Sequence, residues 1–156
     1  MSVSKPNSIS QYFIGSLIVS VIGGFTIILG DFAWYDASNY YLGFFDEGYI
    51  FFSFDKPLSI IIFGSIACLL FIASYVSFLG LQNPDKEGLQ DKVQYATYGA
   101  IGALAILVAG GLLYAIIMLI EDDAYWGFDL GFYGGVIGAG LTITFLYLVK
   151  REFTEN

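Results

Sequence analysis

Few residues of this chain have side chains that commonly carry out catalysis. The sequence contains no histidine and a single cysteine, Cys68. There is therefore no histidine to act as a general base or metal ligand, and no pair of cysteines for an internal disulfide. Cys68 lies within an apolar run, which favours a small packing residue over a reactive thiol. The sequence predicts a protein that is not an enzyme and binds no cofactor.

A run of three acidic residues, Glu121-Asp122-Asp123, offers the carboxylate oxygens that Ca²⁺ and Mg²⁺ prefer. Adjacent carboxylates lack the spaced geometry of a cation-binding loop, so a solvated acidic rim is the favoured interpretation and no metal site is predicted. The chain carries a net charge of −8. This charge argues against nucleic acid or anionic lipid as the main partner.

The elements that must position these residues are long apolar segments. Of the 156 residues, 57% are hydrophobic and 13% are charged, whereas an ordinary soluble domain has about a quarter of its residues charged. Four segments lack Asp, Glu, Lys and Arg, and each approaches the roughly 20 residues that a helix needs to cross a bilayer. The sequence predicts an all-α membrane protein, a four-transmembrane-helix antiparallel bundle. Its single domain, residues 1–156, would have spans at about 12–30, 58–81, 94–120 and 131–149.

The cations indicate the orientation of the four spans. Only Lys56 falls on one side of the predicted membrane, and the other five cations fall on the opposite side: Lys5, Lys86, Lys92, Lys150 and Arg151. Cytoplasmic loops carry an excess of Lys and Arg. We therefore expect a multi-pass protein of the cell membrane with cytoplasmic N- and C-termini, a cytoplasmic loop at 82–92, and outer loops at 31–57 and 121–130.

The first outer loop is rich in aromatic residues. Gly43 and Gly48 divide it into β-prone segments, which predicts a small extracellular cap built around one β-hairpin. Contiguous exposed aromatic residues are rarely left uncovered, so the candidate interaction residues are Phe44, Phe45, Tyr49, Phe51, Phe52 and Phe54. The alternative is an aromatic belt at the lipid headgroups. The belt is the favoured interpretation for four residues near the span ends: Trp34, Tyr35, Tyr125 and Trp126.

Span four carries small residues at steps of four, Gly131, Gly135 and Ala139, and span one carries a similar series, Ser16, Ser20 and Gly24. This spacing places each series on one helix face, where the small side chains let another backbone approach closely. Two uses fit such a face: packing within this bundle, which we favour, and contact with a helix of another protein. The span-four residues are therefore candidate interaction residues as well.

The layout of the whole chain resembles that of the claudin and peripheral-myelin-protein superfamily. The similarity consists of four spans, internal termini, a long β-prone first outer loop and a short second one, with Trp34 near the place of that family's outer-loop tryptophan. The paired outer-loop cysteines and the W-GLW-C-C pattern of the family are absent, so no functional residue carries across. The resemblance implies lateral assembly or adhesion through the outer loops.

Three functions fit these observations. The favoured one is a non-enzymatic accessory or scaffold subunit that contacts other membrane proteins, or copies of itself, through small-residue helix faces and the aromatic, acidic outer loop. The second is a claudin-like, self-assembling adhesion or barrier protein. The third is a small oligomeric cation channel with an acidic outer vestibule and a pore lined by threonines: Thr26, Thr97, Thr142 and Thr144.

The predicted orientation can be tested by labelling single cysteines in intact cells with a membrane-impermeant thiol reagent. A cysteine at position 88 should be inaccessible, whereas cysteines at positions 38 and 124 should react. The physical reason is the five-to-one asymmetry of the cations about the spans. Reversed accessibility would contradict the assignment.

Overall fold

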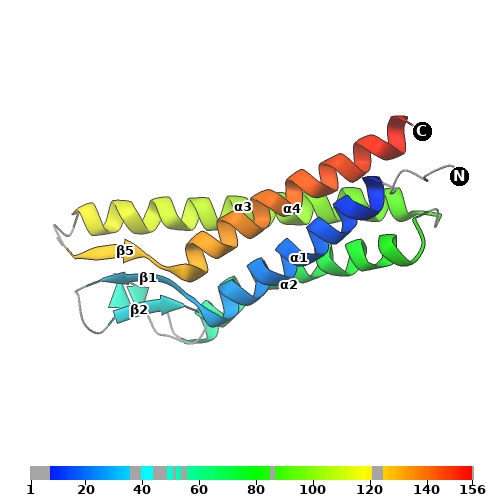
Figure 1. Cartoon of the computed structure of the whole chain (residues 1–156). Helices are drawn as coiled ribbons and strands as arrows, with labels where there is room; N and C mark the ends of the chain where they lie inside the picture. Colours follow the sequence, from blue (N-terminus) through cyan, green and yellow to red (C-terminus); the bar gives the residue numbers. More distant parts are fainter. Residues whose placement is uncertain are drawn as a thin grey trace, which may run out of the picture.

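A computed structural model of the chain describes residues 8–35, 40–43, 49–50, 52–53, 56–84, 87–120 and 125–155. It contains four long helices: α1 (Ser8–Leu29), α2 (Lys56–Gln82), α3 (Leu89–Ile120) and α4 (Leu130–Glu155). Each helix runs antiparallel to the next (Figure 1), with α1 packed against α2 and α4, and α3 packed against the same two helices. The predicted four-helix antiparallel bundle is confirmed, with the start of α1 and the end of α4 at the same end of the bundle.

The helices extend beyond the apolar segments that predict them. α1 begins at Ser8 rather than near 12, α3 begins at Leu89 rather than near 94, and α4 continues to Glu155 rather than 149. An absence of charge marks the part of a helix that suits hydrocarbon, whereas backbone hydrogen bonding continues through polar turns at either end. Pro57 lies in the first turn of α2. Backbone N–H groups in a first turn have no intrahelical acceptor, so the lack of an N–H at proline costs no hydrogen bond there.

The connection between α2 and α3 is shorter than the predicted 82–92 loop, because Leu89 to Lys92 form the first turn of α3. Gly88, just before this turn, has a φ of 73°, which strains any residue with a Cβ. Its neighbour Glu87 is exposed. Glu87 is therefore the better position for the single-cysteine label on this side.

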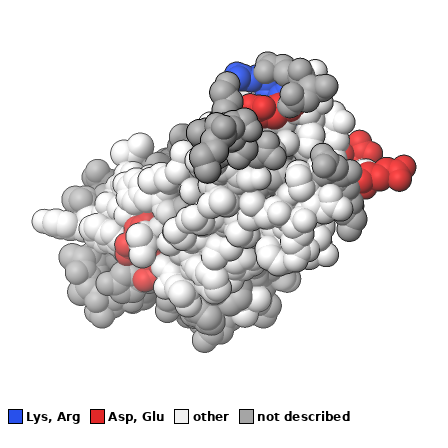
Figure 2. Space-filling view, turned by 45° about the vertical axis from the view of Figure 1, so that its right-hand side comes forward, with Lys and Arg blue, Asp and Glu red and all other residues white. Residues whose placement is uncertain are grey.

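All four helices are long and apolar enough to cross a membrane. Their outward faces carry large apolar side chains that are exposed in the isolated chain, such as Ile22, Phe25, Ile61 and Leu113. On the face drawn in Figure 2, the charged residues lie toward the ends of the molecule and its broad middle is uncharged. The apolar surface of this bundle is therefore on its outside as well as in its core.

Two small antiparallel sheets are described at the end of the bundle away from the termini. The larger has the strand order β2-β1-β5, with β1 (Asp31–Tyr35), β2 (Tyr40–Gly43) and β5 (Trp126–Phe128). The smaller pairs β3 (Tyr49–Ile50) with β4 (Phe52–Ser53). β1 and β2 form a hairpin in the region where the sequence predicts one. β5 comes from the second outer loop, so one sheet joins both loops, which the sequence analysis did not predict.

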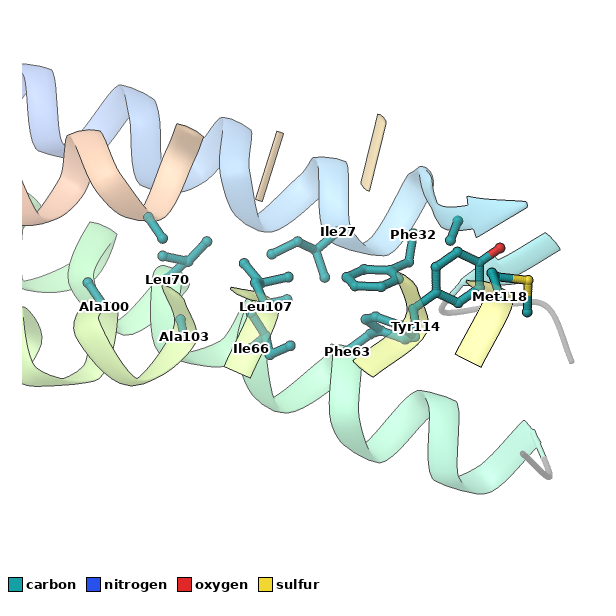
Figure 3. Close-up of a cluster of buried hydrophobic side chains, with 13 residues drawn as sticks. Ile27, Phe32, Phe63, Ile66, Leu70, Ala100, Ala103, Leu107, Tyr114 and Met118 are labelled. Carbon is teal, nitrogen blue, oxygen red and sulfur yellow. The ribbon is translucent and has the colours of Figure 1, made fainter. Parts of the chain in front are cut away.

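Two clusters of buried side chains form the core. The cluster nearer the sheets, which we call the outer cluster, is shown in Figure 3. It contains residues from all four helices and β1, including Ile27, Phe32, Leu70 and Leu107. The inner cluster, toward the termini, includes Phe13, Val93 and Leu146. The ring of Phe13 lies against Gly80, where α2 has no side chain in the way. The outer cluster reaches the sheet through Phe32, and this junction positions the candidate site.

Candidate functional site

The candidate site is the junction between the β2-β1-β5 sheet and the helices. Phe32 of β1 lies at its centre and is 5% exposed. The centroid of its ring lies 5.3 Å from that of Phe63 in α2, 6.2 Å from that of Phe128 in β5 and 5.2 Å from that of Phe132 in α4. Two strands and two helices therefore meet around one aromatic side chain.

Further rings extend this contact to α3. The ring of Tyr114 lies 5.8 Å from both Trp126 and Phe128, and Phe128 stacks on Phe132 at 4.1 Å between centroids. Aromatic pairs of this kind contribute about 0.5–1.5 kcal/mol each beyond the area that they bury. We call the following residues the aromatic cluster: Phe32, Phe63, Tyr114, Trp126, Phe128 and Phe132. Figure 3 shows Phe32, Phe63 and Tyr114 gathered at one end of the buried cluster, with the Tyr114 hydroxyl directed away from the two phenylalanine rings.

Two glycines let the rings approach the backbone. A Cβ on Gly111 of α3 would lie 2.6 Å from the ring of Phe132, and a Cβ on Gly127 of β5 would lie 3.0 Å from the indole of Trp34. A side chain at either position would force the facing ring to move. The sheet can therefore lie directly on α3 and α4 without an intervening gap.

A hydrogen bond joins the sheet to α3 independently of the rings. The Tyr114 hydroxyl donates to the Trp34 carbonyl oxygen at 2.7 Å. Tyr114 is 4% exposed, and a buried hydroxyl in an apolar setting needs such a partner. The bond holds the middle of β1 against the outer part of α3.

Tyr114→Phe should loosen the sheet while the bundle remains folded. The substitution keeps the ring but removes the hydroxyl, and a buried hydrogen bond contributes about 1 kcal/mol. We expect roughly fivefold faster hydrogen–deuterium exchange at the amides of β1 and β5. The control is Tyr95→Phe on the same helix, because Tyr95 is 73% exposed. Equal exchange in the two variants would show that this bond does not hold the sheet.

The aromatic residues predicted to bind a partner are located only in part. Phe44, Phe45, Phe51 and Phe54 lie outside the described residues. Tyr49 and Phe52 lie in β3 and β4, where Tyr49 pairs with Ser53 and Ile50 with Phe52. Their role in partner binding stays a prediction.

The aromatic residues assigned to a lipid belt divide into two groups. Trp126 is partly buried in the aromatic cluster, and Trp34 lies over the backbone of Gly127. Both therefore have packing roles within the cap, which sequence reasoning missed. Tyr125 is 64% exposed, as a belt position requires. The sequence signal of the strand is the Trp126-Gly127-Phe128 triplet just before span four, but three residues are too few to predict a strand.

The small residues of span four lie on the face of α4 that packs against α1. A Cβ on Gly131 would lie 2.7 Å from the Asp31 carbonyl oxygen, and one on Gly135 would lie 2.9 Å from the Ile27 side chain. Ala139 is fully buried in the outer core cluster. Of the two uses considered for this face, the structure shows packing within the bundle. These three residues are covered by the chain itself.

The closest approach of α1 and α4 lies on the same face. A Cβ on Gly138 would lie 2.6 Å from the Cα of Gly23 and 3.2 Å from the Val19 carbonyl oxygen. One turn away, a Cβ on Gly134 would meet the Thr26 side chain at 2.5 Å. The two backbones are therefore in direct contact at Gly23 and Gly138, without side chains between them.

Gly138→Ala should destabilise the bundle, whereas Gly140→Ala should not. The new Cβ at 138 meets backbone atoms that cannot rotate away, whereas nothing lies within 4 Å of a Cβ at 140. Such overpacking costs about 1–3 kcal/mol. Both variants gain similar helix propensity, so their difference in melting temperature in detergent isolates the α1–α4 contact. Equal melting temperatures would contradict the close approach.

Buried hydroxyls join α1 to α2. The Oγ atoms of Ser20 and Ser74 lie 2.7 Å apart, and the Ser77 hydroxyl donates to Ser16 Oγ at 2.8 Å. Three of these residues are fully buried and Ser74 is 7% exposed. Interhelical hydrogen bonds of this kind contribute about 0.6–2 kcal/mol in a membrane. The sequence identifies Ser16 and Ser20 as a small-residue face, but their partners on α2 have no distinctive spacing.

The threonines assigned to a pore do not come together in one copy of the chain. Thr26 lies near the outer end of α1 and Thr97 near the inner end of α3, while Thr142 is fully buried in α4. Thr26, Thr97, Thr142 and Thr144 each donate to a carbonyl oxygen of their own helix. Each hydroxyl therefore has a partner on its own helix, and the four threonines form no common channel within a single copy of the chain.

Cys68, predicted to be a small packing residue rather than a reactive thiol, lies on the exposed, outward side of α2 and is not packed within this bundle. The run around it is apolar on all sides, and such a run does not indicate which face turns inward. Within the described residues, no three His, Cys, Asp or Glu side chains form a group that could hold a metal ion. Glu121, Asp122 and Asp123 lie outside the described residues.

The fold and the site define a four-helix bundle with an apolar outer surface and a β-sheet cap at one end. Comparison of the chain with protein-family models, curated proteins and solved structures finds no match.

Proposed function

We propose that the chain is a multi-pass protein of the cell membrane whose four helices cross the bilayer. The support is the outward apolar surface. Ile22, Ile61 and Leu113 are 56%, 62% and 59% exposed, and lipid would remove this surface from water at a gain of roughly 25 cal/mol per Å². Asp, Glu, Lys and Arg are absent from the four apolar segments, where each would be costly in hydrocarbon.

The proposed orientation places the chain termini in the cytoplasm and the sheet outside. Lys92 lies in the first turn of α3, and Lys150 and Arg151 lie near the end of α4, at the end of the bundle that carries both termini. Positive charges are retained on the cytoplasmic side during insertion. In the proposed orientation, the sheet and the aromatic cluster lie at the extracellular surface.

Within the membrane we propose the role of a non-enzymatic accessory or scaffold subunit. The observation that supports it most directly is the single sheet built from both outer loops and seated on the aromatic cluster. β1 continues from α1 and β5 continues into α4, so two strands of the cap are anchored directly to helices. A recognition surface attached to a rigid support loses less conformational freedom when it binds a partner.

The structure changes which surfaces this proposal uses. The glycine face of α4 packs against α1, so it does not serve as the contact with another protein. The partner would meet the aromatic outer loop, and the outward apolar faces of the helices would contact lipid or neighbouring spans. The claudin-like alternative uses the same cap but brings together copies of this chain. The difference between the two proposals is the composition of the assembly.

The assembly can be identified by purifying the tagged full chain from native membranes and measuring its mass by native mass spectrometry. The accessory role predicts a different protein at a fixed ratio to this chain. A homomer instead would favour the self-assembling alternative, and a monomer retained under gentle extraction would contradict both.

Phe52→Ser/Phe54→Ser should release the partner, because truncating a buried aromatic at an interface costs about 2 kcal/mol or more.

The control for this variant is Phe52→Tyr/Phe54→Tyr, which keeps both rings and should retain the partner. Membrane insertion of each variant is checked by resistance to alkaline extraction. An assembly that survives in the serine variant, with insertion intact, would remove the outer loop from the interface.

A further inference from the structure

We propose that a groove between α3 and α4, at the end of the bundle that carries the termini, binds the headgroup of an anionic phospholipid in the cytoplasmic leaflet. The groove has a volume of about 300 Å³. The inference rests on the proposed membrane insertion, but it concerns the opposite end of the molecule from the cap. It does not depend on whether the cap binds a partner.

The groove is lined by one face of each helix. α3 contributes Gln94, Thr97 and Tyr98, and α4 contributes Tyr147, Lys150 and Arg151. Thr97 and Tyr98 follow Gln94 by three and four positions, and Lys150 and Arg151 follow Tyr147 by the same spacings, so each pair flanks the first residue of its set on the helix surface. Both helices therefore contribute polar side chains to the groove, although most of its lining surface is apolar and it opens on the outward surface of the bundle.

The chemistry of this lining suits a phosphate group. Both charged side chains in it, Lys150 and Arg151, are basic. An arginine guanidinium can bind two phosphate oxygens at once, and a lysine supplies a compact positive charge. The Gln94 side-chain amide donates to the Tyr98 hydroxyl oxygen at 3.0 Å, which leaves the phenol proton to donate to a ligand.

The level of the groove in the proposed membrane favours a lipid as the source of the phosphate. The charge-free segment of α4 ends at Val149, and its 20 residues from Leu130 would span about 30 Å, the thickness of the hydrocarbon core. Lys150 and Arg151 therefore fall at the level of the headgroups. Toward the middle of the bundle the same faces continue with apolar residues, Ile101 on α3 and Ile143 on α4, along which acyl chains could lie.

The net charge of −8 does not exclude this site. Asp31 and Asp129 lie at the other end of the bundle, far beyond the roughly 8 Å over which charges interact at physiological ionic strength. Four acidic residues lie at the same end of the bundle as the groove and weaken its positive potential: Glu87, Asp91, Glu152 and Glu155. Recognition therefore has to come from direct contacts with Lys150, Arg151 and the hydroxyl groups rather than from long-range attraction.

The test is native mass spectrometry of the purified full chain, titrated with phosphatidylglycerol or with phosphatidylcholine of the same acyl chains. We expect phosphatidylglycerol to bind more tightly. Lys150→Gln and Arg151→Gln should each weaken its binding by about fivefold, the effect of one cation near an anionic surface. Lys150→Arg should retain binding. Lys92→Gln removes one cation from the same end without altering the groove lining, and should leave binding unchanged.

Three results would overturn the proposal. Equal binding of the two lipids would show that the groove does not recognise the headgroup charge. An equal loss in Lys92→Gln and Lys150→Gln would show diffuse attraction at the interface rather than a site. Binding of soluble glycerophosphate as tight as that of the lipid would show that the ligand is a free phosphate. Resistance to alkaline extraction is measured separately, so failed membrane insertion would be distinguished from a failed lipid site.

Discussion

The close approach of the α1 and α4 backbones is the constraint on which much of this structure depends. The two helices touch at Gly23 and Gly138, and farther out Gly131 lies against the backbone of Gly30 and Asp31. Because the helices are this close when they leave the bundle, the strands that extend them, β1 and β5, are close enough to pair. Ala33, Trp34 and Tyr35 pair with Phe128, Gly127 and Trp126. The cap therefore continues the α1–α4 contact as a hydrogen-bonded ladder.

The other helices are held by interactions of different kinds. Serine hydroxyls join α1 to α2 through the Ser20–Ser74 and Ser16–Ser77 contacts. α3 is long enough to pass beside the sheet, and it contributes Tyr114 both to the aromatic cluster and to the hydrogen bond with Trp34. Close backbone contact, hydroxyl pairs and aromatic packing can all hold helices together even when the outside of the bundle is as apolar as its core. In lipid, burial of apolar surface provides little force between helices.

This division of roles leads to the functional proposals. The small residues that could have contacted an external helix are used within the bundle. The surfaces left for recognition are the outer cap, the outward helix faces and the groove beside Lys150 and Arg151. The cap is anchored at the ends of α1 and α4, which suits a scaffold or accessory subunit. The groove is at the opposite end, in the position where a lipid headgroup would lie. The two sites can therefore act independently.

The sequence alone determines the number of long helices, their antiparallel order, the β-prone character of the first outer loop and the scarcity of catalytic side chains. Each of these follows from a property of the sequence: runs without charge that must cross the bilayer in alternating directions, aromatic segments punctuated by glycine, and the absence of histidine. The sequence also indicates the small-residue face of α4, because its spacing of four is itself a helix property. It does not specify which neighbour that face contacts.

Only the tertiary structure decided the pairings between distant segments. The contact of Gly138 with Gly23, the serine partners on α2, the addition of β5 to the first-loop sheet and the outward position of Cys68 all depend on how apolar helices rotate about their axes. Helices that are apolar on every side carry no polar face to indicate that rotation. The three residues of β5 are also too few to show alternation in the sequence. The rotation is set by backbone proximity, hydroxyl pairing and ring packing, which exist only once the helices are assembled.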